Sequence, residues 1–183
     1  MQKKISCLLL FALIFPFTFI SCKKHKNDAP VDPLPPASQT GANTLGFLLN
    51  RQPWTPKGFN GTANLSLNYD PTLSGGVFNL SAYKILNSST GTRQRITMFG
   101  DSIQFAQKII LPNRNKFGAI FRDDVSGCDY DISDSNVAIV GGYFDITKLD
   151  KSNNIFAGEF EIKFKKVGCG DIEISQGRFD LKY

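Results

Sequence analysis

Histidine is nearly absent from this chain of 183 residues, since the only one is His25. A nucleophilic serine or cysteine usually needs a histidine beside it as general base. A structural zinc site needs several histidine or cysteine ligands, and beyond residue 25 the sequence has only Cys128 and Cys169. We therefore predict a protein that is not an enzyme and that has no cofactor.

Paired carboxylates are the one catalytic arrangement that the lack of histidine leaves open. A glycosidase needs two acids about 5 to 10 Å apart, and Glu159 and Glu161 have that spacing on one face of a strand. Both alternate with lysines in residues 158–165, a pattern typical of a solvent-exposed sheet face. We interpret them as surface charges.

Long apolar runs are also scarce, and the one present lies between residues 5 and 20. It follows Lys3 and Lys4 and precedes Ser21 and Cys22, the order of parts in a secretory signal peptide. The run contains Pro16 and is short for a helix that crosses a ~30 Å hydrocarbon layer. We predict a signal peptide over residues 1–21 that is cleaved before Cys22; the alternative is an ordinary secretion signal or an uncleaved anchor.

The pair Ser21-Cys22 resembles the lipobox of bacterial lipoproteins, in which the cysteine is acylated through its sulfur. The resemblance implies that Cys22 carries lipid such as palmitate. Two or three acyl chains hold a protein firmly at a membrane without crossing it, whereas one chain binds only marginally. The membrane is therefore the partner that the sequence predicts first.

Residues 22–42 read as a tether, because four prolines stand among polar residues with too little apolar surface to fold. Lys23, Lys24 and Lys26 lie directly after the cysteine, where they suit anionic headgroups. In bacteria of the Bacteroidetes type, an acidic cluster at this place promotes display on the cell surface. The basic cluster therefore favours the periplasmic face of the outer membrane over the cell surface.

Excess charge is missing from the remaining residues 43–183, which carry 16 basic and 14 acidic side chains. Recognition of nucleic acid needs a basic patch on the domain itself, so no nucleic-acid partner is expected. The length suits one domain with its own core.

Helical periodicity is absent too, apart from a short helix predicted over Asp101–Lys108. Glycine and asparagine turns separate runs in which apolar residues alternate with polar ones, as in an antiparallel β domain. In residues 158–165, Phe160, Ile162 and Phe164 share one face. We predict an all-β antiparallel sandwich or flattened barrel of roughly eight to ten strands, whose last three form a meander with a bulge at Gln176-Gly177. The predicted strands cover residues 45–49, 65–69, 77–86, 93–99, 109–111, 117–121, 143–149, 158–165 and 172–183.

Two cysteines, Cys128 and Cys169, remain once Cys7 leaves with the signal and Cys22 takes lipid. An even pair in an oxidising compartment predicts a disulfide. Closing a loop of about 40 residues stabilises a fold by roughly 4 kcal/mol on the chain-entropy model.

Five aspartates crowd around Cys128, and calcium prefers several oxygen ligands from one loop. The glycine and closing glutamate of a helix-loop-helix calcium site are missing, so a solvated acidic loop is the default and calcium the alternative. The aspartates are Asp123, Asp124, Asp129, Asp131 and Asp134, of which the last three are the candidate ligands.

Aromatic residues give the remaining clue to a ligand. Exposed aromatic rings serve as platforms for sugars on β scaffolds, and Trp54, Tyr69, Tyr83 and Tyr130 are candidates. A lone tryptophan is more often a core or hairpin anchor, so this is the interpretation favoured for Trp54. A barrel around a small apolar ligand would instead show a cavity and loose packing at Phe160 and Phe164. The triplet Asp101-Ser102-Ile103 is similar to an O-glycosylation acceptor, although a plain turn is the favoured interpretation of three residues.

Four segments stand out as a set, namely residues 40–46, 49–54, 146–150 and 177–183. Together they resemble a family of small Bacteroidetes lipoproteins that carry a domain of unknown function. The resemblance covers nearly the whole chain after the signal and implies an envelope location and a β fold, without an activity. We therefore expect a lipid-anchored envelope protein with a non-catalytic binding or accessory role. The alternatives are a glycan-binding module and a barrel for a small apolar ligand.

Overall fold

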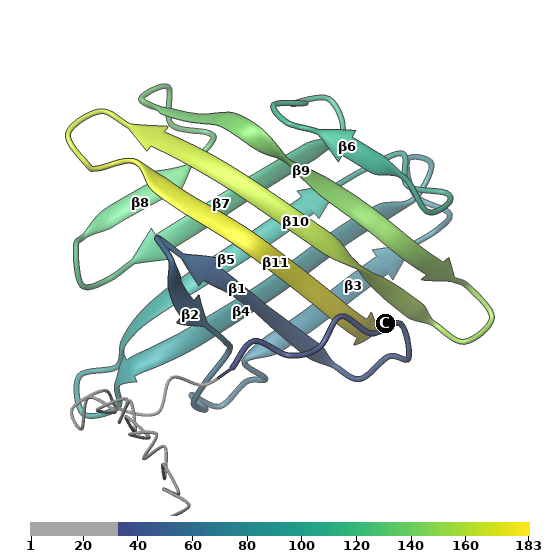
Figure 1. Ribbon diagram of the computed structural model, residues 1–183, viewed down its shortest axis with the longest axis horizontal. Helices are drawn as coiled ribbons and strands as arrows, with labels where there is room; N and C mark the ends of the chain where they lie inside the picture. The colour runs from purple at the N-terminus through teal and green to yellow at the C-terminus, as the bar shows by residue number, and fades with distance from the viewer. Residues whose placement is uncertain (1–32) are drawn as a thin grey trace, which may run out of the picture. The chain divides into compact units, whose positions relative to one another are not determined.

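The computed structural model describes residues 33–183, which form two antiparallel β-sheets and no helix. The six-stranded sheet has the order β2-β1-β11-β10-β9-β6 and the five-stranded sheet the order β3-β4-β5-β7-β8. The sheets lie face to face (Figure 1), so the predicted all-β sandwich is confirmed. The strands are β1 (Thr44–Leu49), β2 (Gln52–Trp54), β3 (Leu65–Asp70), β4 (Val77–Asn87), β5 (Thr92–Gly100), β6 (Lys108–Ile110), β7 (Phe117–Asp123), β8 (Cys128–Asp131), β9 (Val137–Asp150), β10 (Ile155–Lys166) and β11 (Ile172–Lys182).

The predicted signal peptide, Cys22 and the first part of the predicted tether lie outside the described residues. Among residues 33–183, no helix has the length and hydrophobicity needed to cross a membrane.

Two short strands raise the number of strands within residues 33–183 to eleven, above the eight to ten predicted. β2 has three residues and β8 has four, too few for an alternation of apolar and polar residues to stand out in the sequence. β2 and β8 form strands because their backbones pair with the neighbouring strands β1 and β7.

The prediction of a helix over Asp101–Lys108 was wrong, because residues 101–107 form an irregular loop and Lys108 begins β6. Contacts with distant parts of the chain determine its path. Ile103 is fully buried and donates its backbone N–H to the carbonyl oxygen of Gly76 at 3.0 Å. The carbonyl oxygen of Gln107 accepts the N–H of Ile146 at 2.9 Å, so tertiary bonds outweigh a weak local helix preference.

The C-terminal meander is confirmed, with β10 between β9 and β11. Phe160, Ile162 and Phe164 are fully buried, as their alternation predicted. The predicted bulge is present in β11: Phe160 pairs with Gly177 but Ile162 pairs with Ile174, and Gln176 has a φ of 51°.

Phenylalanine rings fill the space between the sheets. Phe78 of one sheet stacks on Phe144 of the other with ring centroids 5.1 Å apart, and Phe144 stacks on Phe179 at 5.2 Å. Phe160 meets both Phe144 and Phe179 and is itself fully buried. Contacts of this kind bury large apolar areas and favour a tightly packed interior.

Residues 33–42, which we call the N-terminal strap, lie against the domain although the sequence assigned them to the tether. Asp180 of β11 holds them, and its side chain is 1% exposed. Its carboxylate accepts hydrogen bonds from the Ser38 hydroxyl at 2.7 Å and from the backbone N–H of Gly41 at 2.7 Å. The backbone N–H groups of Thr40 and Ala42 and the Thr40 hydroxyl bind the same group. The packed part of the chain thus begins before Asn43.

Candidate binding face

Trp54, the first predicted ligand platform, is a core residue. Its ring is 2% exposed and stacks on Phe47 with centroids 4.6 Å apart. Its Nε1 donates to the Oε1 of Gln94 in the other sheet at 3.0 Å, which satisfies the indole N–H. The ring therefore has no open face for a sugar, and Trp54 is the core anchor that the sequence favoured over a ligand platform.

The three candidate tyrosines are buried as well, with exposed fractions between 4% and 8%. Tyr69 donates its hydroxyl to the carbonyl oxygen of Ile103, and Tyr130 donates to that of Gly170. Burial raises the pKa of both phenols. Tyr83 donates to the carbonyl oxygen of Thr62 and so fixes the loop after β2. None of the three rings is a surface platform.

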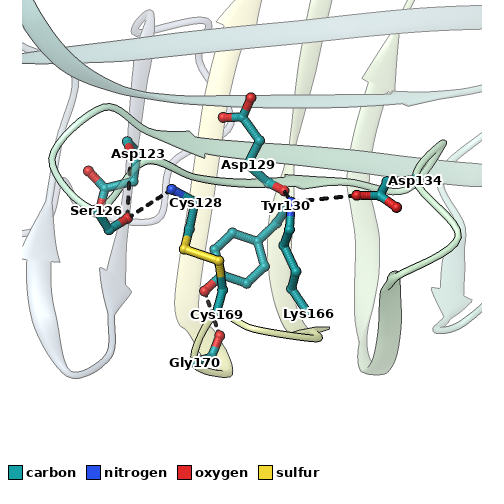
Figure 2. Close-up of a disulfide and its surroundings, with 9 residues drawn as sticks. All are labelled: Asp123, Ser126, Cys128, Asp129, Tyr130, Asp134, Lys166, Cys169 and Gly170. Atoms are coloured by element: carbon teal, nitrogen blue, oxygen red, sulfur yellow. Dashed lines mark hydrogen bonds and ion pairs between the residues drawn. A yellow bond between two sulfur atoms is a disulfide. The ribbon is translucent and has the colours of Figure 1, made fainter.

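The predicted disulfide between Cys128 and Cys169 is present, with Cα atoms 6.2 Å apart. It joins the start of β8 in one sheet to the turn between β10 and β11 of the other. Figure 2 shows Lys166 beside this link, where its Nζ donates to the carbonyl oxygen of Asp129 and lies 3.5 Å from a carboxylate oxygen of Asp134. The disulfide and the lysine together fasten one edge of the sandwich.

The candidate calcium ligands Asp129, Asp131 and Asp134 are already engaged with the protein. Arg122 lies 3.8 Å from Asp129 and 3.3 Å from Asp131. Hydrogen bonds from the backbone and hydroxyl of Ser133 hold the pKa of Asp131 below its usual value. Across residues 33–183, no three metal-ligating side chains come together, so the structure does not assemble the calcium site that was the alternative to a solvated acidic loop.

Glu159 and Glu161 lie on the outer side of the six-stranded sheet, as expected for surface charges. Glu159 pairs with Asp145 of β9, and the Nζ of Lys108 is 3.7 Å from that aspartate. Burial and the nearby carboxylates raise the pKa of Tyr143. Neither glutamate lines any of the five hollows described for the surface.

The opposite sheet has a different outer side, formed by the three neighbouring strands β4, β5 and β7 of the back sheet in Figure 1. Their inward residues, such as Leu80, Ile96 and Phe121, belong to the core. The outward residues between them form what we call the outer face. It consists of three adjacent rows: Asn79, Phe99 and Gly118; Ser81, Thr97 and Ile120; and Tyr83, Arg95 and Arg122.

The largest of the described hollows, about 390 Å³, lies at the first row. Phe99 is half-buried there, and its ring covers Gly118, where a Cβ atom would collide with it. The absence of a side chain at Gly118 thus lets an aromatic ring lie flat on the sheet. Charged and amide groups line the same hollow as the ring; they belong to Asn79, Asp101, Arg114, Asn115 and Lys116.

Two further hollows, of about 330 and 130 Å³, occupy the second and third rows and share Arg95 and Thr97. The larger is bounded by the loop that Tyr83 fixes, and the smaller lies between Arg95 and Arg122 over Ile120. Hydroxyl and amide groups line the larger one; they belong to Asn60, Thr62, Ser66, Ser81 and Thr97.

Sequence reasoning named Tyr83 and missed the other residues of this face, although the sequence contains one sign of them. In Arg93–Phe99 the apolar Ile96 and Met98 alternate with polar residues, so Phe99 falls on the polar side of its strand. An aromatic ring out of phase with the alternation marks an exposed aromatic position on an otherwise polar sheet face.

Comparisons with protein-family models, with curated proteins and with solved structures found no match. The resemblance to small Bacteroidetes lipoproteins therefore stays a prediction.

Proposed function

We propose that the protein is an exported, lipid-anchored protein of the bacterial envelope whose folded domain is a non-catalytic binding module. The signal-like residues 1–21 and Cys22 support export and anchoring. The disulfide between Cys128 and Cys169 agrees with an oxidising compartment outside the cytoplasm. The basic residues after Cys22 favour the periplasmic side of the outer membrane over the cell surface.

The contrast between a filled interior and a hollowed outer face carries the proposal. Phe160 and Phe164 are fully buried and in contact with other rings, whereas a barrel for an apolar ligand needs free space at these positions. Three of the five described hollows lie instead in adjacent rows of the outer face. Binding on this face needs no rearrangement of the core.

A glycan is the ligand class that the outer face suits best. Phe99 offers an apolar ring. The amide groups in its own hollow and the hydroxyl groups in the hollow of the next rows donate and accept hydrogen bonds, as sugar hydroxyls require. An extended peptide usually pairs its backbone with a free strand edge. β4, β5 and β7 each pair on both sides, so they offer no such edge.

The described residues support a role without catalysis. No histidine is present after residue 25. The aspartates with lowered pKa values, such as Asp70 and Asp150, owe them mainly to hydrogen bonds within their own turns. Perturbed acids in a shared cleft would instead suggest catalysis.

A thermal-shift screen of the full chain in detergent tests the proposal. Neutral and acidic oligosaccharides are compared with fatty acids, the ligands of the alternative barrel function. A ligand at about 100 times its dissociation constant stabilises by roughly 2.7 kcal/mol, a shift of several degrees. We expect stabilisation by an oligosaccharide that Phe99→Ala abolishes; stabilisation by fatty acids alone would contradict the proposal.

A further inference from the structure

We propose that the outer face selects an anionic oligosaccharide, with one sugar ring on Phe99 and a carboxylate or sulfate group between Arg95 and Arg122. This inference rests on the proposed function and specifies the chemistry of its ligand. It depends on two arginines that share the smallest hollow and on their distance from the aromatic ring.

Arg95 is the residue available to an anion. Across residues 33–183 it forms no ion pair, whereas Arg122 is already near Asp129 and Asp131. The hollow that the two arginines share is lined otherwise only by Thr97 and Ile120. A guanidinium group donates to a carboxylate or sulfate through two parallel N–H groups, which gives both strength and direction.

The distance between the two features sets the length of the ligand. Arg95 and Phe99 lie on the same side of β5, four residues apart, and Thr97 stands between them. Four residues of extended strand span about 13 Å, the length of a short oligosaccharide rather than of a single sugar. The hydroxyls of Ser81 and Thr97, 3.1 Å apart, provide hydrogen bonds to the middle of such a ligand.

An acidic peptide is the competing occupant, because arginines also bind acidic side chains. The outer face favours the oligosaccharide, since its central strands have no unpaired backbone and its lining is rich in hydroxyl and amide groups. The half-buried Phe99 ring is a flat apolar surface of the kind that a sugar ring covers. An acidic peptide is therefore included in the test as a separate probe.

Calorimetric titration of the full chain in detergent tests the inference with four probes: trigalacturonate, a sulfated trisaccharide, maltotriose and triglutamate. The variants are Arg95→Gln and Phe99→Ala, and Arg178→Gln is the matched control, since it removes the same charge from the six-stranded sheet. We expect Arg95→Gln to weaken binding of an acidic sugar about 10- to 100-fold. We expect Arg178→Gln to leave the affinity for the acidic sugar unchanged, and added salt to weaken binding of that sugar to the wild type.

The possible outcomes distinguish a failure of this inference from a failure of the proposed function. Maltotriose binding as tight as that of both acidic sugars, lost in Phe99→Ala but not in Arg95→Gln, would overturn the anionic inference and keep the proposed function. Binding of no sugar would overturn both. Tighter binding of triglutamate than of the acidic sugars would overturn the inference in favour of a peptide ligand. A loss of affinity in Arg178→Gln equal to that in Arg95→Gln would overturn it in favour of unspecific charge attraction. The two acidic sugars distinguish carboxylate from sulfate.

Discussion

Replacement of Asp180 by alanine removes the acceptor of all five hydrogen bonds between β11 and residues 38–42. The side chain is 1% exposed, so water does not replace it without movement of the strap. We expect the strap to separate from β11 in Asp180→Ala and the domain to lose stability.

The size of the stability loss depends on the hydrogen bonds removed and on the conformational entropy that the strap regains when it is released. A hydrogen bond to a charged group contributes about 1.5–3 kcal/mol, but five bonds on one carboxylate are not additive. A released strap also regains about 1–2 kcal/mol of backbone entropy per residue, which limits the loss. We expect a loss of about 3 kcal/mol in the free energy of unfolding, or about 6–12 °C in Tm for a domain of this length.

The dependence on pH has a definite sign. Burial raises the pKa of Asp180, but hydrogen bonds from Ser38 and from the backbone of Thr40, Gly41 and Ala42 outweigh burial and bring the pKa below the ordinary value of 3.8. The contribution of Asp180 to stability is therefore complete above the unfolded pKa and is lost as the pH falls through the native pKa. Asp180→Ala should flatten the fall of stability below about pH 4.

Urea unfolding followed by fluorescence measures the effect, because the single tryptophan, Trp54, is buried in the core. Asp171→Ala is the matched control, because Asp171 is exposed and its carboxylate forms one surface ion pair, with the Nζ of Lys165 at 3.7 Å. We expect its free energy of unfolding to change by no more than about 0.5 kcal/mol. Hydrogen exchange at Gly41 should accelerate in Asp180→Ala alone. Equal stability and equal exchange in the two variants would refute the reasoning.

Three further predictions concern the disulfide, the core and the anchor. Conversion of both Cys128 and Cys169 to serine should lower the unfolding free energy by about 4 kcal/mol for a loop of this length; an unchanged urea midpoint would contradict this. Phe160→Ala should lower it by about 3–5 kcal/mol, whereas Phe105→Ala, at a position 65% exposed, should change it by less than about 0.5 kcal/mol; equal losses would contradict the filled core. Cys22→Ser should abolish incorporation of labelled palmitate in the native host and release the protein from membranes; labelling that persists would contradict anchoring at Cys22.

The parts of the fold that depend on local pattern could be predicted from the sequence. Alternation alone places Phe160, Ile162 and Phe164 inside and identifies the C-terminal meander. The disulfide could be predicted because Cys128 and Cys169 are the two cysteines that follow the predicted signal peptide and lipid-attachment site. Both arguments need no knowledge of which strands meet.

Features that depend on distant contacts could not be predicted. The strap has the proline-rich composition of a tether, and a carboxylate about 140 residues away holds it. Trp54 lies in a strand of three residues, where alternation cannot tell an inward ring from an outward one. The outer face brings together β4, β5 and β7, and its row from Arg95 to Arg122 exists only through their register.

Backbone amide chemical shifts of the full chain, recorded by NMR during titration with trigalacturonate, test the central claim most directly. If the outer face is the binding site, the largest changes should fall on β4, β5 and β7 around Thr97 and Phe99, with the six-stranded sheet unaffected. Changes centred on β9 and β10 around Glu159, or on core residues such as Phe160, would contradict the account.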